Sequence, residues 1–171
     1  MSRGSPQPRP HPDDQKGAAG MRFAVCATRW NPEIVDELLA GALGALEAKG
    51  AAVDPVRRCA GVFELAPLCA RVARKGGVDG IVALGCLIRG DTDHYALLAS
   101  EVTRSLGMLA MEGATSPRPL AVAFGVLACD TPEQARERAD RARLNKGAEA
   151  ALACIEQVHA LRSANAEVEG G

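Results

Sequence analysis

The stretch of sequence that decides the fold joins a predicted strand to a predicted helix in the middle of the chain. It reads Leu84-Gly85-Cys86-Leu87-Ile88-Arg89-Gly90-Asp91-Thr92-Asp93-His94-Tyr95. The apolar run that ends at Gly85 is typical of a buried strand, and the apolar residues after Tyr95 recur at helical spacing. A helix that begins just after a strand presents free N–H groups, which suit an anion such as phosphate. His94 lies within one turn of that position and can exchange a proton near neutral pH.

On both sides of this junction, predicted strands and helices alternate. The predicted strands cover residues 22–27, 53–58, 80–84 and 120–127. The predicted helices cover residues 32–49, 67–75, 93–111, a short segment from residue 132, and 148–161. Asn31 is expected to cap the first of these helices, and Thr131 begins a capping box for the fourth.

Repeated strand–helix units need right-handed crossovers, which give a parallel sheet covered by helices on both faces. The predicted fold class is therefore α/β: a three-layer αβα sandwich with a flavodoxin-like, four-stranded parallel sheet in the order 2-1-3-4. Residues 21–163 are expected to form this one domain. Residues 1–20, rich in Pro and Gly, are expected to be a disordered extension, and residues 164–171 a disordered tail.

The composition narrows the classes of function. The chain has 171 residues, of which 47% are hydrophobic and 24% charged, as in a globular protein. Its net charge of −1 is not the excess of positive charge that nucleic-acid binding usually needs. No segment approaches the roughly 20 consecutive apolar residues that a membrane-spanning helix needs. The six cysteines form no C-x-x-C pair and have no metal-ligand spacing. We therefore expect reduced structural thiols, no metal site, no nucleic-acid or membrane partner, and a cytoplasmic location.

Ligands of such sheets bind beyond the carboxyl ends of the strands, at the switch point between the first and third strands. Three predicted loops meet there, at residues 28–31, 61–64 and 88–94. Trp30, the single Trp of the chain, would stack on a planar heterocycle or else cover the helix behind it. Glu64 would accept hydrogen bonds from a polyol or a ring N–H, or else remain a solvated carboxylate.

The loop before the third helix also has two interpretations. Gly90, Asp91 and Thr92, preceded by Arg89, suit a phosphate, but Thr92 could instead only cap the helix. His94 is either the acid–base group of the site or a capping or core histidine.

Two further segments carry residues of interest. Phe124 places an aromatic side chain near the end of the fourth strand. A basic run surrounds the predicted helix break and consists of Arg138, Arg141, Arg143 and Lys146. Such a run is most often a solvated face, although an anionic ligand would also need it.

Together these segments resemble the 6,7-dimethyl-8-ribityllumazine synthase family of riboflavin biosynthesis. The resemblance rests on Arg29-Trp30-Asn31, Gly61-Val62-Phe63-Glu64-Leu65, Gly85 to Tyr95, Phe124-Gly125-Val126-Leu127, Glu137-Arg138-Ala139 and Asn145-Lys146-Gly147. They follow the family's order over about residues 22–161. The resemblance implies that 5-amino-6-(D-ribitylamino)uracil condenses with 3,4-dihydroxy-2-butanone 4-phosphate. A Schiff base forms, phosphate is eliminated and ring closure yields the lumazine, with no metal or organic cofactor.

The resemblance also assigns roles to individual residues. His94 would be the proton shuttle, and Arg138 would complete the phosphate pocket. The phosphate-binding residues would be Gly90, Asp91, Thr92 and Arg138. The substrate-binding residues would be Trp30, Asn31, Val62, Phe63, Glu64, Cys86, Leu87, Ile88, Phe124 and Lys146. Among these, Phe124, Arg138 and Lys146 would reach the site from a neighbouring subunit of a homopentamer.

The family's sixty-subunit cages use an N-terminal strand added to a neighbour's sheet. Residues 13–20 have little strand propensity, and Pro occurs at four earlier positions, so we expect a ring of five. The sequence also departs from the family pattern. Ala60 and Ala66 stand where the family usually has Pro, and residues 140–144 are bulkier and more basic than the usual Gly-rich stretch.

Three other classes of protein have similar scaffolds. A non-catalytic lumazine- or flavin-binding protein could lose His94 or Arg138, but both are present. The archaeal type of riboflavin synthase needs no phosphate pocket, so Thr92 and Arg138 argue against it. A flavodoxin-type electron carrier needs a Ser/Thr-rich loop after its first strand, and residues 28–31 are not one.

Overall fold

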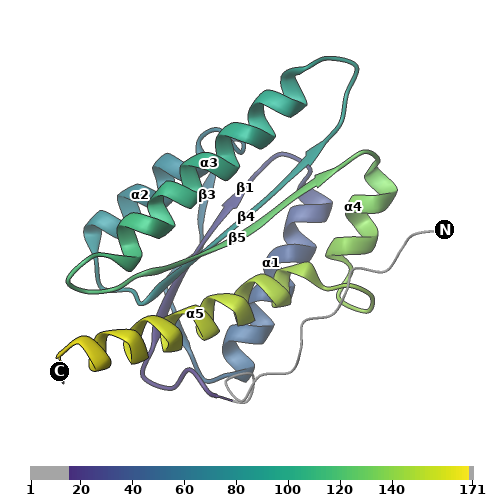
Figure 1. The fold of residues 1–171 in the computed structure, drawn as a ribbon. Coiled ribbons are helices and arrows are strands. Elements are labelled where there is room, and N and C mark those ends of the chain that lie inside the picture. Colours follow the sequence, from purple (N-terminus) through teal and green to yellow (C-terminus); the bar gives the residue numbers. More distant parts are fainter. Residues whose placement is uncertain (1–15, 170–171) are drawn as a thin grey trace.

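Strands and helices alternate along residues 16–169, the part of the chain that the computed structural model describes (Figure 1). The strands are β1 (Arg22–Thr28), β2 (Ala52–Val53), β3 (Arg57–Cys59), β4 (Gly80–Ile88) and β5 (Ala121–Cys129). The helices are α1 (Pro32–Ala48), α2 (Leu65–Lys75), α3 (His94–Ala114), α4 (Pro132–Ala139) and α5 (Lys146–Glu169). None of the helices in residues 16–169 is long and apolar enough to cross a membrane.

All strand pairs that form the sheet are parallel, in the order β2-β1-β4-β5, with β3 also paired to β1. This confirms the predicted order, because β2 and β3 together replace the predicted strand over residues 53–58. That strand is interrupted at Pro55, which has no N–H to donate to a ladder. β4 is longer than predicted, since its register with β5 continues to Ile88, opposite Cys129.

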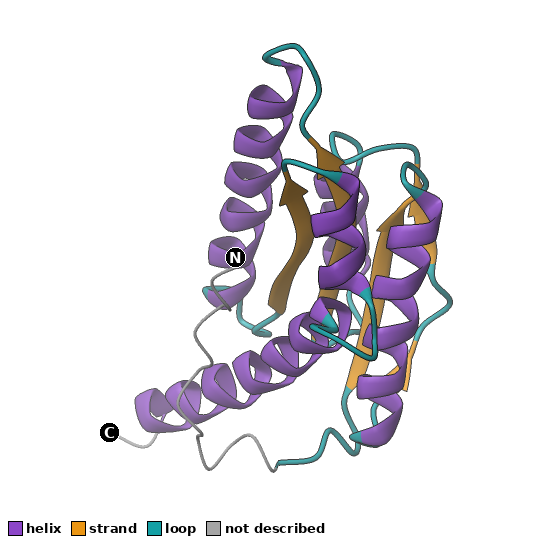
Figure 2. Cartoon of the chain, turned by 90° about the vertical axis from the view of Figure 1, so that its right-hand side faces the viewer, coloured by secondary structure: helices purple, strands orange, loops and turns teal. Residues whose placement is uncertain are grey.

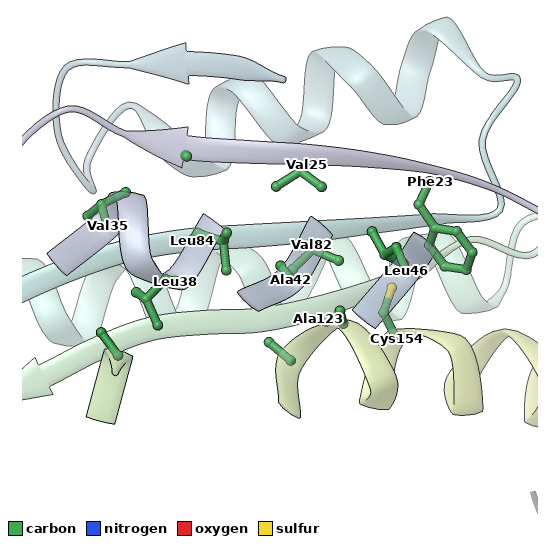
Figure 3. Close-up of a cluster of buried hydrophobic side chains, with 14 of the residues drawn as sticks. Phe23, Val25, Val35, Leu38, Ala42, Leu46, Val82, Leu84, Ala123 and Cys154 are labelled. Atoms are coloured by element: carbon green, nitrogen blue, oxygen red, sulfur yellow. The ribbon is translucent and has the colours of Figure 1, made fainter. Parts of the chain in front are cut away.

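Helices cover both faces of the sheet, with α1, α4 and α5 on one face and α2 and α3 on the other (Figures 1 and 2). The larger core lies between the sheet and α1 and α5, where Phe23, Leu38 and Leu46 are fully buried (Figure 3). A second core lies under α2 and α3 and contains Leu65, Ile81 and Leu106. The parallel sheet is therefore buried on both faces, as βαβ crossovers require.

Two helix starts differ in their capping. Thr131 caps α4 as predicted: its Oγ1 accepts a hydrogen bond from the Gln134 N–H at 3.3 Å. Asn31 is the N-cap residue of α1, as predicted, but its side chain makes no cap bond. Its backbone is left-handed (φ 55°), a conformation that Asn tolerates better than most residues, and its amide group points elsewhere.

The two ends of the described chain are more ordered than the sequence predicted. α5 continues to Glu169 instead of ending near residue 161, so residues 164–169 are helical and not part of a disordered tail. At the other end, Ala18 is buried and its N–H donates to the Lys49 carbonyl at 2.7 Å. Residues 1–15, the rest of the predicted extension, lie outside the described residues.

The two longest elements on one face, α1 and α5, approach each other closely where α5 begins. Gly147 lies against the backbone of Leu38, and a Cβ on Gly147 would lie 2.7 Å from the Leu38 carbonyl carbon. Gly41 of α1 lies against Asn145 in the same way. These glycines therefore let α5 begin directly on α1.

We expect Gly147→Ala to lower the free energy of unfolding by about 1–3 kcal/mol, because the added methyl group has no space against the Leu38 backbone. The control is Gly44→Ala in α1, at a position where a Cβ meets nothing within 4 Å. This control should raise stability by about 0.5–1 kcal/mol, because Ala is the better helix former. Urea denaturation measures both, and a Gly147→Ala protein as stable as wild type would contradict the packing.

Candidate active site

A pocket of about 1280 Å³ lies at the carboxyl ends of β1 and β4, between the start of α2 and the first turns of α3. The predicted site residues that line it are Trp30, Asn31, Val62, Phe63, Glu64, Cys86, Leu87, Ile88 and His94. The three loops that the sequence placed at the switch point therefore do converge in one chain.

The exit of β1 forms one wall and is tied to both other loops. The Nδ2 of Asn31 donates to the Cys86 carbonyl at 3.0 Å, which links this loop to β4. The N–H groups of Arg29 and Trp30 donate to the Ala60 carbonyl at 3.1 and 3.3 Å. Trp30 itself is 71% exposed, so its ring is free to stack on a planar ligand instead of covering the helix behind it.

The loop before α2 forms a second wall. The Glu64 carboxylate accepts a hydrogen bond from the Gly61 N–H at 2.9 Å. A Cβ on Gly61 would lie 3.4 Å from Trp30 Cδ1, so this loop packs directly against the aromatic ring. Val62 is buried, whereas Phe63 is 62% exposed. Glu64 is thus an ordered acceptor at the rim of the pocket.

The last residues of β4 form the floor. Cys86 is buried, and desolvation raises the pKa of its thiol to about 12, with the nearby Cys129 acting in the same direction. The thiol is therefore neutral at physiological pH and is unsuited to act as a nucleophile. A ligand at this end of β4 would therefore mainly meet the main-chain groups of Cys86, Leu87 and Ile88.

The loop between β4 and α3 is open to solvent. Gly90, Asp91, Thr92 and His94 are all exposed. The N-cap of α3 is Asp93, not Thr92, and no side-chain cap bond closes this helix start. The first N–H groups of α3 therefore remain available to an anion, and the interpretation of Thr92 as a plain helix cap does not hold.

Arg89 occupies a different position from the one predicted for a phosphate ligand. Its Nε donates to the Asp130 carboxylate at 2.7 Å, and its guanidinium lies 4.5 Å from the centre of the Tyr95 ring. The Asp130 carboxylate, as hydrogen-bond acceptor and as a nearby negative charge, also raises the pKa of Arg89. The guanidinium is thus engaged within the chain.

Six predicted site residues do not line this pocket: Gly90, Asp91 and Thr92 of the exposed loop before α3, and Phe124, Arg138 and Lys146. Arg138 is on α4, on the opposite face of the sheet from α3, and its Nη1 donates to the Gln134 carbonyl at 3.1 Å. Its charge acts on the Cys129 thiol at the carboxyl end of β5, where it opposes the rise in pKa that burial causes. Phe124 is 46% exposed on β5, the edge strand of the described sheet.

The basic run is mostly paired with carboxylates. Arg141 contacts Glu37 at 3.0 Å, Arg143 contacts Glu137 at 3.6 Å and Lys146 contacts Glu149 at 2.6 Å. For these residues the interpretation as a solvated, ion-paired face fits the structure. Within residues 16–169, Arg138 is the member of the run that has no carboxylate partner.

The first turns of α3 form a further wall of the pocket, which was not predicted from the sequence. It contains Ala96, Leu97, Leu98, Ser100 and Glu101. The available signal was helical spacing, because residues three, four and seven positions after His94 share its face of the helix. Leu97 is 68% exposed and Glu101 accepts hydrogen bonds from Arg104 and Ser105.

The fold and the site define a three-layer α/β protein whose ligand pocket lies at the carboxyl end of a parallel sheet, with an exposed histidine beside an uncapped helix start. The family model for 6,7-dimethyl-8-ribityllumazine synthase matches residues 20–162. The proteins of that name from Anaeromyxobacter sp. (strain Fw109-5) and Anaeromyxobacter dehalogenans (strain 2CP-C) are 43% and 45% identical to this chain. These matches cover 86% and 84% of this chain, and 88% and 87% of the relatives.

The Myxococcus xanthus protein of the same name is 44% identical, over 81% of this chain and 84% of its own length. The chain belongs to the 6,7-dimethyl-8-ribityllumazine synthase family.

The raised pKa of Cys86 predicts that iodoacetamide does not modify it in the folded protein at pH 7. With a pKa of about 12, only about one thiol in 10⁵ is ionised at that pH, and only the thiolate reacts. Labelling should increase as the pH rises, and urea-unfolded protein should react readily at the same pH. Mass spectrometry that finds Cys86 alkylated equally fast in folded and unfolded protein would contradict the assignment.

Proposed function

We propose that this chain condenses 5-amino-6-(D-ribitylamino)uracil with 3,4-dihydroxy-2-butanone 4-phosphate to form 6,7-dimethyl-8-ribityllumazine. The observation that carries the proposal is the single pocket in which a free aromatic ring, an ordered carboxylate, a strand end and an uncapped helix start with a histidine meet. Each of these features matches one chemical part of the two substrates. The family to which the chain belongs supports the same reaction.

The pyrimidine substrate fits the side of the pocket formed by β1 and β4. Its planar ring would stack on Trp30, and its polar edge would pair with the main chain of residues 86–88. The ribityl hydroxyls would lie along Asn31 and the loop of Val62, Phe63 and Glu64, where the Glu64 carboxylate accepts hydrogen bonds. Asn31 would hold the ring-binding and ribityl-binding sides of the pocket together, since its amide donates a hydrogen bond to the Cys86 carbonyl.

The phosphate of the second substrate fits the start of α3. The exposed residues Gly90, Asp91 and Thr92 would offer N–H groups and a hydroxyl, and the positive end of the helix dipole favours the charge. His94 begins the same helix and lines the same pocket. It would therefore lie next to the bonds that change during the reaction.

The reaction requires several proton transfers. The primary amine of the pyrimidine attacks the ketone, and loss of water gives the Schiff base. Phosphate then leaves as the adjacent carbon loses a proton, and the resulting enol takes up a proton at its terminal carbon to become a methyl ketone. The ribityl-bearing nitrogen attacks this ketone and closes the ring with loss of a second water. A histidine at the phosphate end can take the proton from carbon and return one to a departing oxygen.

We expect His94→Ala to fold normally and to lose about 10²–10⁴-fold in kcat, the usual contribution of a general acid–base group. The matched control is His159→Ala, because His159 lies on α5 and contacts the Gly17 carbonyl, outside the pocket. Lumazine fluorescence measures both rates. A His94→Ala enzyme within a few-fold of wild type would rule out this role for His94.

The proposed assembly is a homopentameric ring, supported by exposed apolar side chains on one face of α3. This face carries Leu97, Glu101, Arg104, Met108 and Met111, of which Glu101 and Arg104 form an ion pair with each other. Their spacing alternates between four and three residues, as on the contact face of helices that pack side by side. Leu97, Met108 and Met111 are 68%, 52% and 68% exposed within one chain, so a neighbouring copy would bury a substantial apolar area.

The proposed ring also explains why some site residues are absent from the pocket. In a cyclic assembly, two different surfaces of each subunit meet, so one subunit can complete the site of the next. Phe124 lies on the open β5 edge, beside a shallow apolar groove that Ala110 and Leu161 also line. Arg138, on α4, lies near Cys129 at the carboxyl end of the same strand. These residues would close the pocket of the neighbouring subunit, with Arg138 on the phosphate and Lys146 on the substrate.

A cytoplasmic location is the remaining part of the proposal. All six cysteines are free, and five of them are buried. Free thiols are typical of proteins in a reducing compartment.

The shared site predicts complementation between two inactive variants. His94→Ala and Arg138→Ala should each be nearly inactive, Arg138→Ala because the phosphate loses its bidentate partner. Rings assembled from equal amounts of both should recover about a quarter of wild-type activity, because about a quarter of the interfaces then carry both intact residues. Light scattering should give a mass of five chains.

Mass spectrometry of the intact assemblies shows whether the two chains have mixed. If mixed rings were no more active than their parents, both residues would belong to one subunit's site. A mass near sixty chains would contradict the open ring.

A further inference from the structure

We infer that Arg89 is a positioning residue that fixes the phosphate-binding loop, and that it does so through its contacts with Asp130 and Tyr95 instead of binding the phosphate itself. These three residues are called the Arg89 clamp below. The inference rests on the proposed function, because it concerns how the loop of residues 90–92 is held for the phosphate.

The loop has few other contacts that could fix it. Residues 90–93 are exposed, and a Cβ on Gly90 would meet nothing within 4 Å. The start of α3 has no side-chain cap. Such a segment samples many conformations unless something at its ends holds it. Arg89 is the residue directly before it, and Tyr95 the second residue of the helix that follows.

The Arg89 clamp joins both ends of the loop to the sheet. The Arg89 N–H donates to the Cys129 carbonyl at 2.9 Å, which extends the pairing of β4 with β5 by one residue. The Arg89 side chain then bonds to Asp130 at 2.7 Å and lies over the Tyr95 ring at 4.5 Å. One side chain thus connects the end of β5, the beginning of the loop and the first turn of α3.

The same contacts place the two sides of the site relative to each other. Tyr95 directly follows His94, and Asp130 directly precedes Thr131, the cap of α4. The Asp130 N–H also donates to Gln134 Oε1 at 3.1 Å, and the Gln134 carbonyl accepts from Arg138. A continuous set of contacts therefore runs from the helix that begins at His94 to the helix that carries Arg138.

A direct role of Arg89 as a phosphate ligand fits these contacts less well. Its Nε already donates to a carboxylate, and its cationic face is covered by the Tyr95 ring. To reach a phosphate at residues 90–92 it would have to leave both partners. The ion pair is exposed, with 55% of the Arg89 and 63% of the Asp130 side chain accessible, so its contribution to global stability is small. Its effect is expected on the conformation of the loop.

The test compares phosphate binding and kinetics in Arg89→Gln, Asp130→Asn, the double variant and Arg89→Lys. If the clamp keeps the loop in its binding conformation, Arg89→Gln should weaken calorimetric binding of inorganic phosphate about fivefold, because apparent affinity falls with the fraction of competent loop. The KM for the phosphate substrate should rise equally, while the KM for the pyrimidine changes by less than about twofold. Arg89→Lys should restore most of the affinity.

Asp130→Asn separates positioning from direct binding. A positioning role predicts that it weakens phosphate binding as Arg89→Gln does, and that the double variant is no worse than either single variant. If Arg89 bound phosphate directly, Asp130→Asn would release the guanidinium and leave phosphate binding unchanged or tighter. That result, or additive effects in the double variant, would overturn the inference.

The matched control is Arg162→Gln. Arg162 forms an ion pair of the same length, 2.7 Å, with Asp79, and its side chain is 50% exposed. Asp79 precedes the beginning of β4, so this pair lies at the opposite end of the sheet from the loop. Phosphate binding and both KM values should remain at wild-type levels in this variant.

Hydrogen exchange separates failure of the inference from failure of the proposed function. The amides of Arg89 and Leu97 donate to the Cys129 and Asp93 carbonyls at the two ends of the loop, and their exchange should be faster in Arg89→Gln than in wild type and unchanged in Arg162→Gln. Wild-type protein that neither binds phosphate nor forms lumazine would refute the proposed function, whatever the exchange shows. Unchanged exchange in Arg89→Gln would refute the clamp, even in an active enzyme.

Discussion

The parallel pairing of β1 with β4 is the constraint on which the rest of the site depends. It places Ala27 opposite Leu84, so the chain leaves both strands at the same edge of the sheet. Gly85 lets the structure close there, because a Cβ would lie 3.1 Å from Val62 and 3.2 Å from the Thr28 methyl group. The Asn31 amide then joins the two exits through the Cys86 carbonyl. The ring of Trp30, the Glu64 carboxylate and the start of α3 meet in one pocket because the register of β1 with β4 is fixed.

Much of the fold could be predicted because its signals are local. The alternation of strands and helices predicted the layers and the strand order, and the structure confirms both. The predicted cap at Thr131 is confirmed as well. The misses have long-range causes. β4 runs to Ile88 because β5 pairs with it that far, and α5 packs on α1 from Gly147 and continues to Glu169. A local sequence pattern does not indicate which strand will pair with another or which helix will pack against another.

The site could be predicted where the type of residue alone suggests its chemistry. It was harder to predict where tertiary contacts determine what a side chain can bind. Trp30, Glu64 and His94 were identified from their place after strands, and all three line one pocket. Arg89 was predicted from its charge to suit a phosphate, but its Nε donates to the carboxylate of Asp130, 41 residues further along the chain. Leu97 and Glu101 were missed because the helix face that borders a pocket depends on tertiary packing. Phe124, Arg138 and Lys146 lie outside the pocket of their own chain, and in the proposed ring they would complete the site of a neighbouring subunit.

The most direct test of the central claim uses Trp30 as a reporter. It is the single Trp of the chain and lies exposed in the pocket where the heterocycle is proposed to stack. Titration with 6,7-dimethyl-8-ribityllumazine should quench the Trp30 emission saturably, with the same dissociation constant that calorimetry gives. Lumazine that binds by calorimetry while the Trp30 emission stays unchanged would contradict a site at the carboxyl ends of β1 and β4.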